Sequence, residues 1–221
     1  MTQNYLYSKA FLFAKDYIKN NRLNIRKVTC NFTKDRTNDS SNNRGTIEKS
    51  LECIHIEMPH QIYMISDLIG DDLRCVKIIQ RDMILLNVVL KNHGCCYIEF
   101  LKRTNINDTN VSVYLLSNLQ SKVLRKTLSI HTDNDISVFI NFPTYKSNIK
   151  KISDGYVKIC RNWKLILKKV FTQDDMMTYM LKDYINNIEK KKINKIHMER
   201  IKQFVLLYKN LKNTDKKLSH K

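Results

Sequence analysis

The chain has 221 residues, enough to bury a hydrophobic core in one domain with a long appendage or in two small domains. Its 39 lysines and arginines exceed its 21 aspartates and glutamates, which gives a formal net charge of +18. With 43% hydrophobic residues, four glycines and two prolines, the composition excludes collagen-like, low-complexity and disordered chains, and also Gly-rich phosphate-binding loops.

Residue usage indicates an A/T-rich gene. Lysine (29), isoleucine (25) and asparagine (23) have the most A/T-rich codons and together make up 77 of the residues. Such usage is typical of viruses, plasmids, organelles and some parasites, and we expect a virus-encoded protein. Codon bias raises the lysine count by itself, but it does not hold the acidic residues down to 21. The excess of basic residues therefore still indicates an acidic binding partner, although codon bias accounts for part of it.

The N-terminal third begins with a predicted amphipathic helix over residues 5–20. Apolar residues recur there at steps of three and four. A strand is predicted over residues 25–32, where Val28, Cys30 and Phe32 alternate with polar residues. Residues 33–46 carry both charge signs and no apolar side chain, which predicts a surface loop.

Between residues 47 and 142 the apolar period is two, which predicts a series of strands. Residues 118–129 fit a strand or a helix equally. Five to seven strands at short intervals, without a long helical pattern between them, favour an antiparallel sheet or sandwich. We expect strands near 51–56, 73–79, 84–90, 96–100, 111–116 and 136–140, with turns at 92–94, 105–110 and 133–135.

After residue 144 the apolar period returns to 3.6, which predicts basic C-terminal helices. The first is expected over 156–171 and the second over 174–187, with Thr172 and Asp175 as its capping residues. A last helix is expected over 193–211.

The predicted fold class is therefore α+β, with an N-terminal helix, a central antiparallel sheet or sandwich, and basic C-terminal helices. The predicted division places the N-terminal helix and the β-rich core in residues 1–143 and a basic helical region in residues 144–221.

Positive charge is concentrated in the last third of the chain. Residues 144–221 hold 20 basic and 7 acidic residues, against 19 and 14 in residues 1–143. Because lysines that neutralise phosphates release condensed counterions, this asymmetry predicts contact with nucleic acid or an anionic membrane. The excess of lysine over arginine favours phosphate contacts with little base preference. The predicted binding residues are Lys150, Lys151, Lys158, Arg161, Lys164, Lys168, Lys169, Lys190, Lys191, Lys192 and Lys195.

Trp163 is the only tryptophan of the chain, and it has two interpretations. Next to Arg161 it is the best candidate for stacking on a base. Its helical spacing from Ile159 and Ile166 instead places it in the core, and this second interpretation is the one we expect.

Sequence motifs of catalysis are absent from the chain: it has no H-E-x-x-H, no G-x-S-x-G and no dinucleotide-binding fingerprint. Asp67, Asp71 and Asp72 offer carboxylates for Mg²⁺ and phosphoryl chemistry, as in a metal-dependent nuclease. A solvated turn before the strand near residue 73 accounts for them better. We expect a protein that is not an enzyme.

A zinc site is the other chemical alternative. Cys53 and His55 on one strand, and His93 and Cys95 on another, would supply four ligands if the two strands paired. Structural zinc sites more often use other spacings, so buried free cysteines and ordinary histidines are expected, with no metal or cofactor.

Lysines at positions 9 and 15 interrupt the apolar N-terminus, and no stretch reaches 18 apolar residues. We therefore expect no signal peptide, no membrane span, and an intracellular location in cytoplasm or nucleus, of a host cell if the protein is viral.

We expect a non-enzymatic accessory protein that binds nucleic acid, with RNA favoured over DNA. A homo-oligomer is a further possible partner. The alternative is a matrix-like structural protein whose basic surface meets an anionic membrane or an acidic partner. In that alternative, Phe11 and Phe13 of the N-terminal helix lie in the membrane interface.

Overall fold

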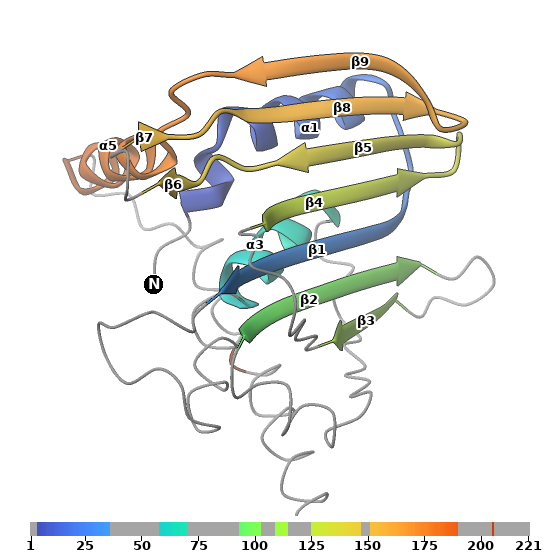
Figure 1. Cartoon of the computed structure of the whole chain (residues 1–221), viewed down its shortest axis with the longest axis horizontal. Helices are drawn as coiled ribbons and strands as arrows, with labels where there is room; N and C mark the ends of the chain where they lie inside the picture. The colour runs from blue at the N-terminus through green and yellow to red at the C-terminus, as the bar shows by residue number, and fades with distance from the viewer. Residues whose placement is uncertain are drawn as a thin grey trace, which may run out of the picture.

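The computed structural model describes residues 4–35, 58–69, 93–102, 109–114, 125–146, 151–189 and residue 205, and it shows an α+β fold (Figure 1). The elements are the 3-10 helix η1 (Asn4–Tyr7), α1 (Lys9–Asn20), β1 (Ile25–Asp35), α3 (Met58–Ile69), β2 (His93–Lys102), β3 (Thr109–Tyr114), β4 (Arg125–Thr132), β5 (Ile136–Asn141), β6 (Tyr145–Lys146), β7 (Lys151–Ile152), β8 (Gly155–Arg161), β9 (Lys164–Phe171) and α5 (Met176–Glu189).

Seven of the described strands form one antiparallel sheet in the order β3-β2-β1-β4-β5-β8-β9. β1 lies inside the sheet, between β2 and β4. β6 and β7 pair separately as a short two-stranded ribbon. The sheet confirms the predicted antiparallel architecture, and among the described strands β3 and β9 form its two edges.

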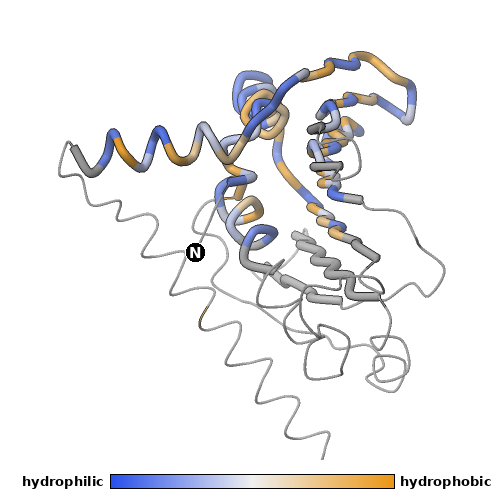
Figure 2. Tube along the Cα trace, turned by 60° about the vertical axis from the view of Figure 1, so that its left-hand side comes forward, coloured by the Kyte–Doolittle hydropathy of each residue, from blue (hydrophilic) through white to orange (hydrophobic). Residues whose placement is uncertain are grey.

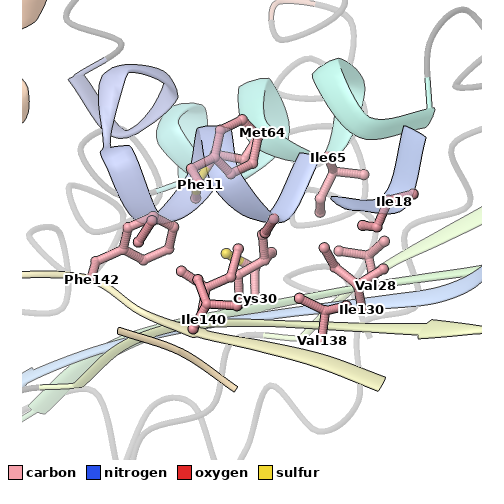
Figure 3. Packing of buried hydrophobic residues seen from close by; sticks show 14 of the residues in the cluster. Phe11, Ile18, Val28, Cys30, Met64, Ile65, Ile130, Val138, Ile140 and Phe142 are labelled. Atoms are coloured by element: carbon pink, nitrogen blue, oxygen red, sulfur yellow. The ribbon is translucent and has the colours of Figure 1, made fainter. Parts of the chain in front are cut away.

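The hydrophobic core lies between one face of the sheet and the helices. α1 and α3 lie on the same face, and their apolar side chains meet those of the central strands (Figure 3). Phe11 on α1 and Met64 on α3 are fully buried, as are Val28, Ile130 and Val138 on the strands. Burial of this kind contributes about 25 cal/mol for each Å² of apolar surface, which makes this layer the main source of stability.

The predicted helix near the N-terminus and the strand after it are confirmed. α1 buries Phe11, Ala14 and Ile18 at three- and four-residue steps, as expected for one face of a helix. β1 extends to Asp35, so the first residues of the predicted loop belong to the strand. Along the tube in Figure 2, hydrophobic and hydrophilic residues follow one another in short steps, as strands and helices with one buried face require.

Two local predictions in the middle of the chain are wrong. Residues 58–69 form helix α3, where a turn near Asp67 and no helix were expected. Pro59 lies in its first turn, where proline costs no helical hydrogen bond. The predicted turn at 92–94 is also incorrect in part, because His93 and Gly94 begin β2 and pair with Asp35 and Lys34 of β1.

The predicted helix over residues 156–171 is also wrong. These residues form the β8–β9 hairpin, whose two strands pair antiparallel from Gly155↔Phe171 to Arg161↔Lys164. Buried and partly exposed residues alternate strictly along β8 from Gly155 to Cys160, which is the period of a strand. Because β8 pairs with β5, the sheet continues across the domain boundary predicted at residue 143.

A helix, α5, lies where the second C-terminal helix was predicted, but its only lysine is outnumbered by Asp183 and Glu189, so the helix is not basic. Its cap also differs from the prediction. Asp175, not Thr172, caps it: Asp175 Oδ1 accepts from the Thr178 amide at 3.1 Å, and Oδ2 accepts from the Thr178 hydroxyl at 2.7 Å. Hydrogen bonds from the Thr178 side chain and backbone lower the pKa of Asp175 below its ordinary value.

A buried carboxylate joins the two ends of the described fold. Asp174 is 1% exposed and accepts hydrogen bonds from Ser8 Oγ at 2.7 Å and from the backbone amides of Lys9 at 2.9 Å and Ala10 at 3.4 Å. Ser8 Oγ in turn accepts from the Phe11 amide at 3.4 Å. The first turn of α1 is therefore capped by a residue 164 to 166 positions away, and the negative charge lies at the positive end of the helix.

α5 is held near η1 by further polar contacts. The Tyr7 hydroxyl donates to Asp183 Oδ2 at 2.7 Å. Hydrogen bonding to Tyr179 raises the pKa of the Lys9 ammonium above its ordinary value. The start of α5 and the N-terminal segment therefore form one packed unit.

Several predictions fall outside the described residues. They are the strands near 51–56, 73–79 and 84–90, most of the loop at 33–46, residues 105–108 of the predicted turn, and the last helix over 193–211 apart from residue 205.

Candidate nucleic-acid interface

The sheet has a second face that no described helix covers. It faces the viewer in Figure 1, with α1 and α3 behind the strands. We call it the open face and define it by the side chains that alternate with the buried ones along β1, β4, β5 and β8, together with their opposite residues Lys168 and Val170 on β9. The residues from the first four strands are Lys27, Thr29, Asn31, Thr127, Ser129, His131, Ser137, Phe139, Asn141, Tyr156, Lys158 and Cys160. None of these residues is acidic.

Strand register places one row of these residues side by side. Phe139 on β5 is opposite Lys158 on β8, and Lys158 is opposite Lys168 on β9. Side chains directly opposite each other on antiparallel strands lie about 5 Å apart at Cβ. An aromatic ring and two ammonium groups therefore form a continuous row across the open face.

Tyr156 lies next to this row, two residues before Lys158 on the same face of β8. The Lys158 ammonium is 5.4 Å from the centre of its ring, and the Lys168 ammonium is 5.8 Å from it. Both distances are within the range of cation–π attraction. Tyr156, Lys158 and Lys168 therefore form one cluster on the open face, which we call the Tyr156 station.

Trp163 lies at the tip of the β8–β9 hairpin and is 81% exposed. The prediction that it belongs to the core is wrong. Its ring centre is 6.3 Å from that of His131, whose own centre is 5.9 Å from Phe139. An aromatic series therefore leads from the exposed hairpin tip onto the open face.

The backbone of this tip is unusual for the residues it contains. Asn162 and Trp163 both have positive φ, 48° and 65°. Two-residue hairpin turns of this shape strongly prefer glycine at the second position, because a side chain there is strained. Placing a tryptophan at this position costs stability, and the cost is consistent with a role for the exposed ring.

The predicted basic residues are distributed over three different surfaces. Lys158 and Lys168 meet at the Tyr156 station. Arg161 and Lys164 are exposed next to the hairpin turn. Lys169 points to the helix side, where its ammonium lies 4.3 Å from the ring centre of Phe13. These residues come from strands, so the predicted helical surface is wrong for residues 158–169.

The side chains of the other predicted lysines are not among those that the structure describes. Lys151 lies in β7, and the structure describes only its place in that strand. Lys150, Lys190, Lys191, Lys192 and Lys195 lie outside the described residues.

Tyr156, Phe139 and His131 were missed by the sequence predictions. In the predicted strand at 136–140, Ser137 and Phe139 alternate with three aliphatic residues, a pattern that could have indicated an outer face for Phe139. Tyr156 had the same signal, but it was hidden by the helical interpretation of β8. His131 gave no local signal.

The acidic cluster considered for catalysis lies only partly within the described residues. Asp67 pairs with Lys15 at 2.6 Å, while Asp71 and Asp72 lie outside the described residues. On the sheet, His131 Nδ1 lies 2.9 Å from Ser137 Oγ, but the two residues are direct cross-strand partners, so their register accounts for the contact.

The zinc hypothesis remains a prediction. His93 and Cys95 both lie on β2, and Cys53 and His55 are outside the described residues. Within the part of the chain that the structure describes, no three or more histidine, cysteine, aspartate or glutamate residues are grouped so that they could hold a metal ion.

The two phenylalanines of the N-terminal helix that were considered for a membrane interface pack against other parts of the described fold. Phe11 is fully buried in the core, and Phe13 packs on Phe171 with ring centres 5.7 Å apart. Among the described residues, no helix has both the length and the apolar content to cross a bilayer.

In comparisons with known proteins, no family model, no curated protein and no solved structure matches the chain.

Proposed function

We propose that this protein binds single-stranded nucleic acid, with RNA favoured over DNA, on the open face of its sheet. It acts as a non-enzymatic accessory protein, and its A/T-biased composition is in keeping with a viral gene. The observation that carries the proposal is the Tyr156 station, where Lys158 and Lys168 are direct cross-strand partners over one aromatic ring.

Two like charges at directly opposed positions destabilise a sheet. Lys158 and Lys168 occupy such positions, and the 17 residues from Gly155 to Phe171 contain five basic residues and no acidic one. A phosphate between the two ammonium groups removes their repulsion and releases counterions. The arrangement therefore favours a bound polyanion.

The aromatic residues favour a single strand over a duplex. Unpaired bases expose their faces, and open sheets that bind single strands stack these bases on aromatic side chains. Trp163 offers an exposed ring at the hairpin tip, and Phe139 and Tyr156 lie on the open face behind it. Stacking tolerates every base, and lysine contacts phosphates as a point charge, so we expect weak sequence preference.

The test is a salt titration of the purified protein against labelled single-stranded and double-stranded RNA and DNA. We expect single-stranded RNA to bind most tightly at ~150 mM salt, with affinity falling as a power of the salt concentration. Vesicles containing phosphatidylserine serve as a parallel arm. If the protein still binds vesicles at a salt concentration at which all four nucleic acids have dissociated, the proposal is wrong and the membrane alternative takes its place.

Trp163 allows function to be separated from folding. Replacing it by glycine is expected to leave the stability unchanged or raise it by up to about 1 kcal/mol, because glycine relieves the strain at positive φ. The same change is expected to weaken RNA binding about tenfold by removing a stacking partner. Thermal unfolding by circular dichroism and RNA anisotropy measure the two effects.

Trp163→Phe is the matched control, since it keeps an aromatic ring and should retain most of the affinity. A Trp163→Gly protein that is less stable but binds RNA as before would assign the tryptophan a purely structural role.

A further inference from the structure

β9 is an edge strand with an unusually apolar exposed surface. Among the described strands, it pairs with β8 on one side and with none on the other. Leu165 is 58% exposed, Ile166 53%, Leu167 38% and Val170 49%. An edge with unpaired backbone groups and exposed branched side chains is a template for a further strand.

The charge of β9 determines which strand can be added. Its eight residues include Lys164, Lys168 and Lys169 and no acidic residue. If β9 paired with β9 of a second copy, three lysines would meet three lysines, and like charges on neighbouring strands are unfavourable. A strand with acidic side chains would instead form cross-strand ion pairs.

Lysines on an edge strand also protect a sheet from aggregation. Protection accounts for the charges, but it does not account for four exposed aliphatic residues beside them, because an exposed hydrophobic edge strand favours pairing with another chain. Apolar side chains together with only positive charges favour a partner strand that is apolar and acidic, whereas a purely protective edge would disfavour every partner.

We propose that the edge of β9 binds an extended segment of a partner protein, with acidic and apolar residues in alternation, by strand addition. The backbone of the segment continues the sheet beyond β9. Its carboxylates lie on the side of the sheet that carries Lys168, and its apolar residues lie on the side that carries Leu167. Its net negative charge is also attracted by Lys164 and Lys169. This site is the rim of the sheet and adjoins the open face to which nucleic-acid binding is assigned, because Lys168 belongs to both.

The experiment uses the full chain and short capped peptides of about the length of β9. The first peptide alternates valine with glutamate, the second has lysine in place of glutamate, and the third is the valine–glutamate peptide with alternate amides N-methylated. Because Trp163 is the only tryptophan and precedes β9 directly, its fluorescence reports on binding.

We expect the valine–glutamate peptide to shift Trp163 emission and to slow hydrogen exchange of the β9 amides. The lysine peptide should bind at least about tenfold more weakly, because its charges repel those of β9. The N-methylated peptide keeps the charge and the side chains but lacks backbone donors, and should not bind.

Lys164→Glu should reduce the affinity for the valine–glutamate peptide about tenfold. Lys182→Glu makes the same charge change at an exposed position of α5 and should not. Equal binding of all three peptides, or of none, would overturn strand addition. Dimers in sedimentation that Leu167→Lys abolishes would assign the edge to a second copy. The peptide titrations contain no nucleic acid, so their outcome does not depend on the RNA result.

Discussion

Replacing Lys158 and Lys168 together by glutamate is expected to weaken binding of single-stranded RNA about a hundredfold at ~150 mM salt. Both ammonium groups lie over Tyr156, so the double change converts the most positive spot of the open face into a negative one. Anisotropy with labelled RNA measures the loss. Replacement by glutamine, which only removes the charges, should lower the log–log salt slope by about 1.4, the value for two phosphate contacts on a single strand.

Two controls make this result specific. Lys19→Glu makes the same charge change at an exposed position of α1, on the helix side of the sheet, and should alter affinity little. Lys158→Glu alone places opposite charges at directly opposed positions. It should therefore raise the melting temperature while lowering the affinity. If Lys19→Glu costs as much affinity as the double change, binding follows net charge and the open face is not the site.

Asp174→Ala is expected to lower the free energy of unfolding by about 3 kcal/mol, because it leaves the Ser8 hydroxyl and two amides of the first turn of α1 without their acceptor. The carboxylate is almost completely buried, so water cannot easily replace it. Chemical denaturation followed by circular dichroism measures the change. Asp174→Asn keeps one acceptor oxygen and should cost less.

Asp175→Ala is the matched control for this prediction. It removes only the cap of α5 and should cost about 1 kcal/mol. Because the pKa of Asp175 is lower in the folded protein, its contribution is complete above the ordinary pKa of the carboxyl group. The contribution is lost as the pH falls through the lowered value, so Asp175→Asn should approach the wild-type stability in acid. Equal losses for Asp174→Ala and Asp175→Ala would show that the link between the two ends contributes nothing beyond a local cap.

The helix α1 and the strands β1 and β5 could be predicted because their signals are local. α1 shows a 3.6-residue period and the serine before it accepts a hydrogen bond from its first turn. β5 alternates buried and partly exposed residues along its whole length. Each element has one face in the core, and this requirement produces a periodic spacing of apolar residues in the sequence.

The β8–β9 hairpin could not be recognised in the same way. Its turn contains Asn162 and Trp163, so the glycine that normally marks such a turn is missing. All residues of β9 before Phe171 are exposed, so the strand has no buried alternation to reveal it. Apolar residues of the two strands, such as Ile159, Trp163 and Ile166, also happen to recur at helical spacing, and only the pairing of β8 with β9 shows that they form strands.

By itself, the sequence determined an α+β fold with an antiparallel sheet and a positive charge concentrated near its C-terminal end. These properties depend on composition and on periods within single elements. The tertiary structure decided that Lys158 and Lys168 meet over Tyr156, that Trp163 is exposed, and that Asp174 caps α1. Each of these arrangements depends on strand register, on an unusual turn, or on a contact between residues far apart in the chain, and no local period encodes such contacts.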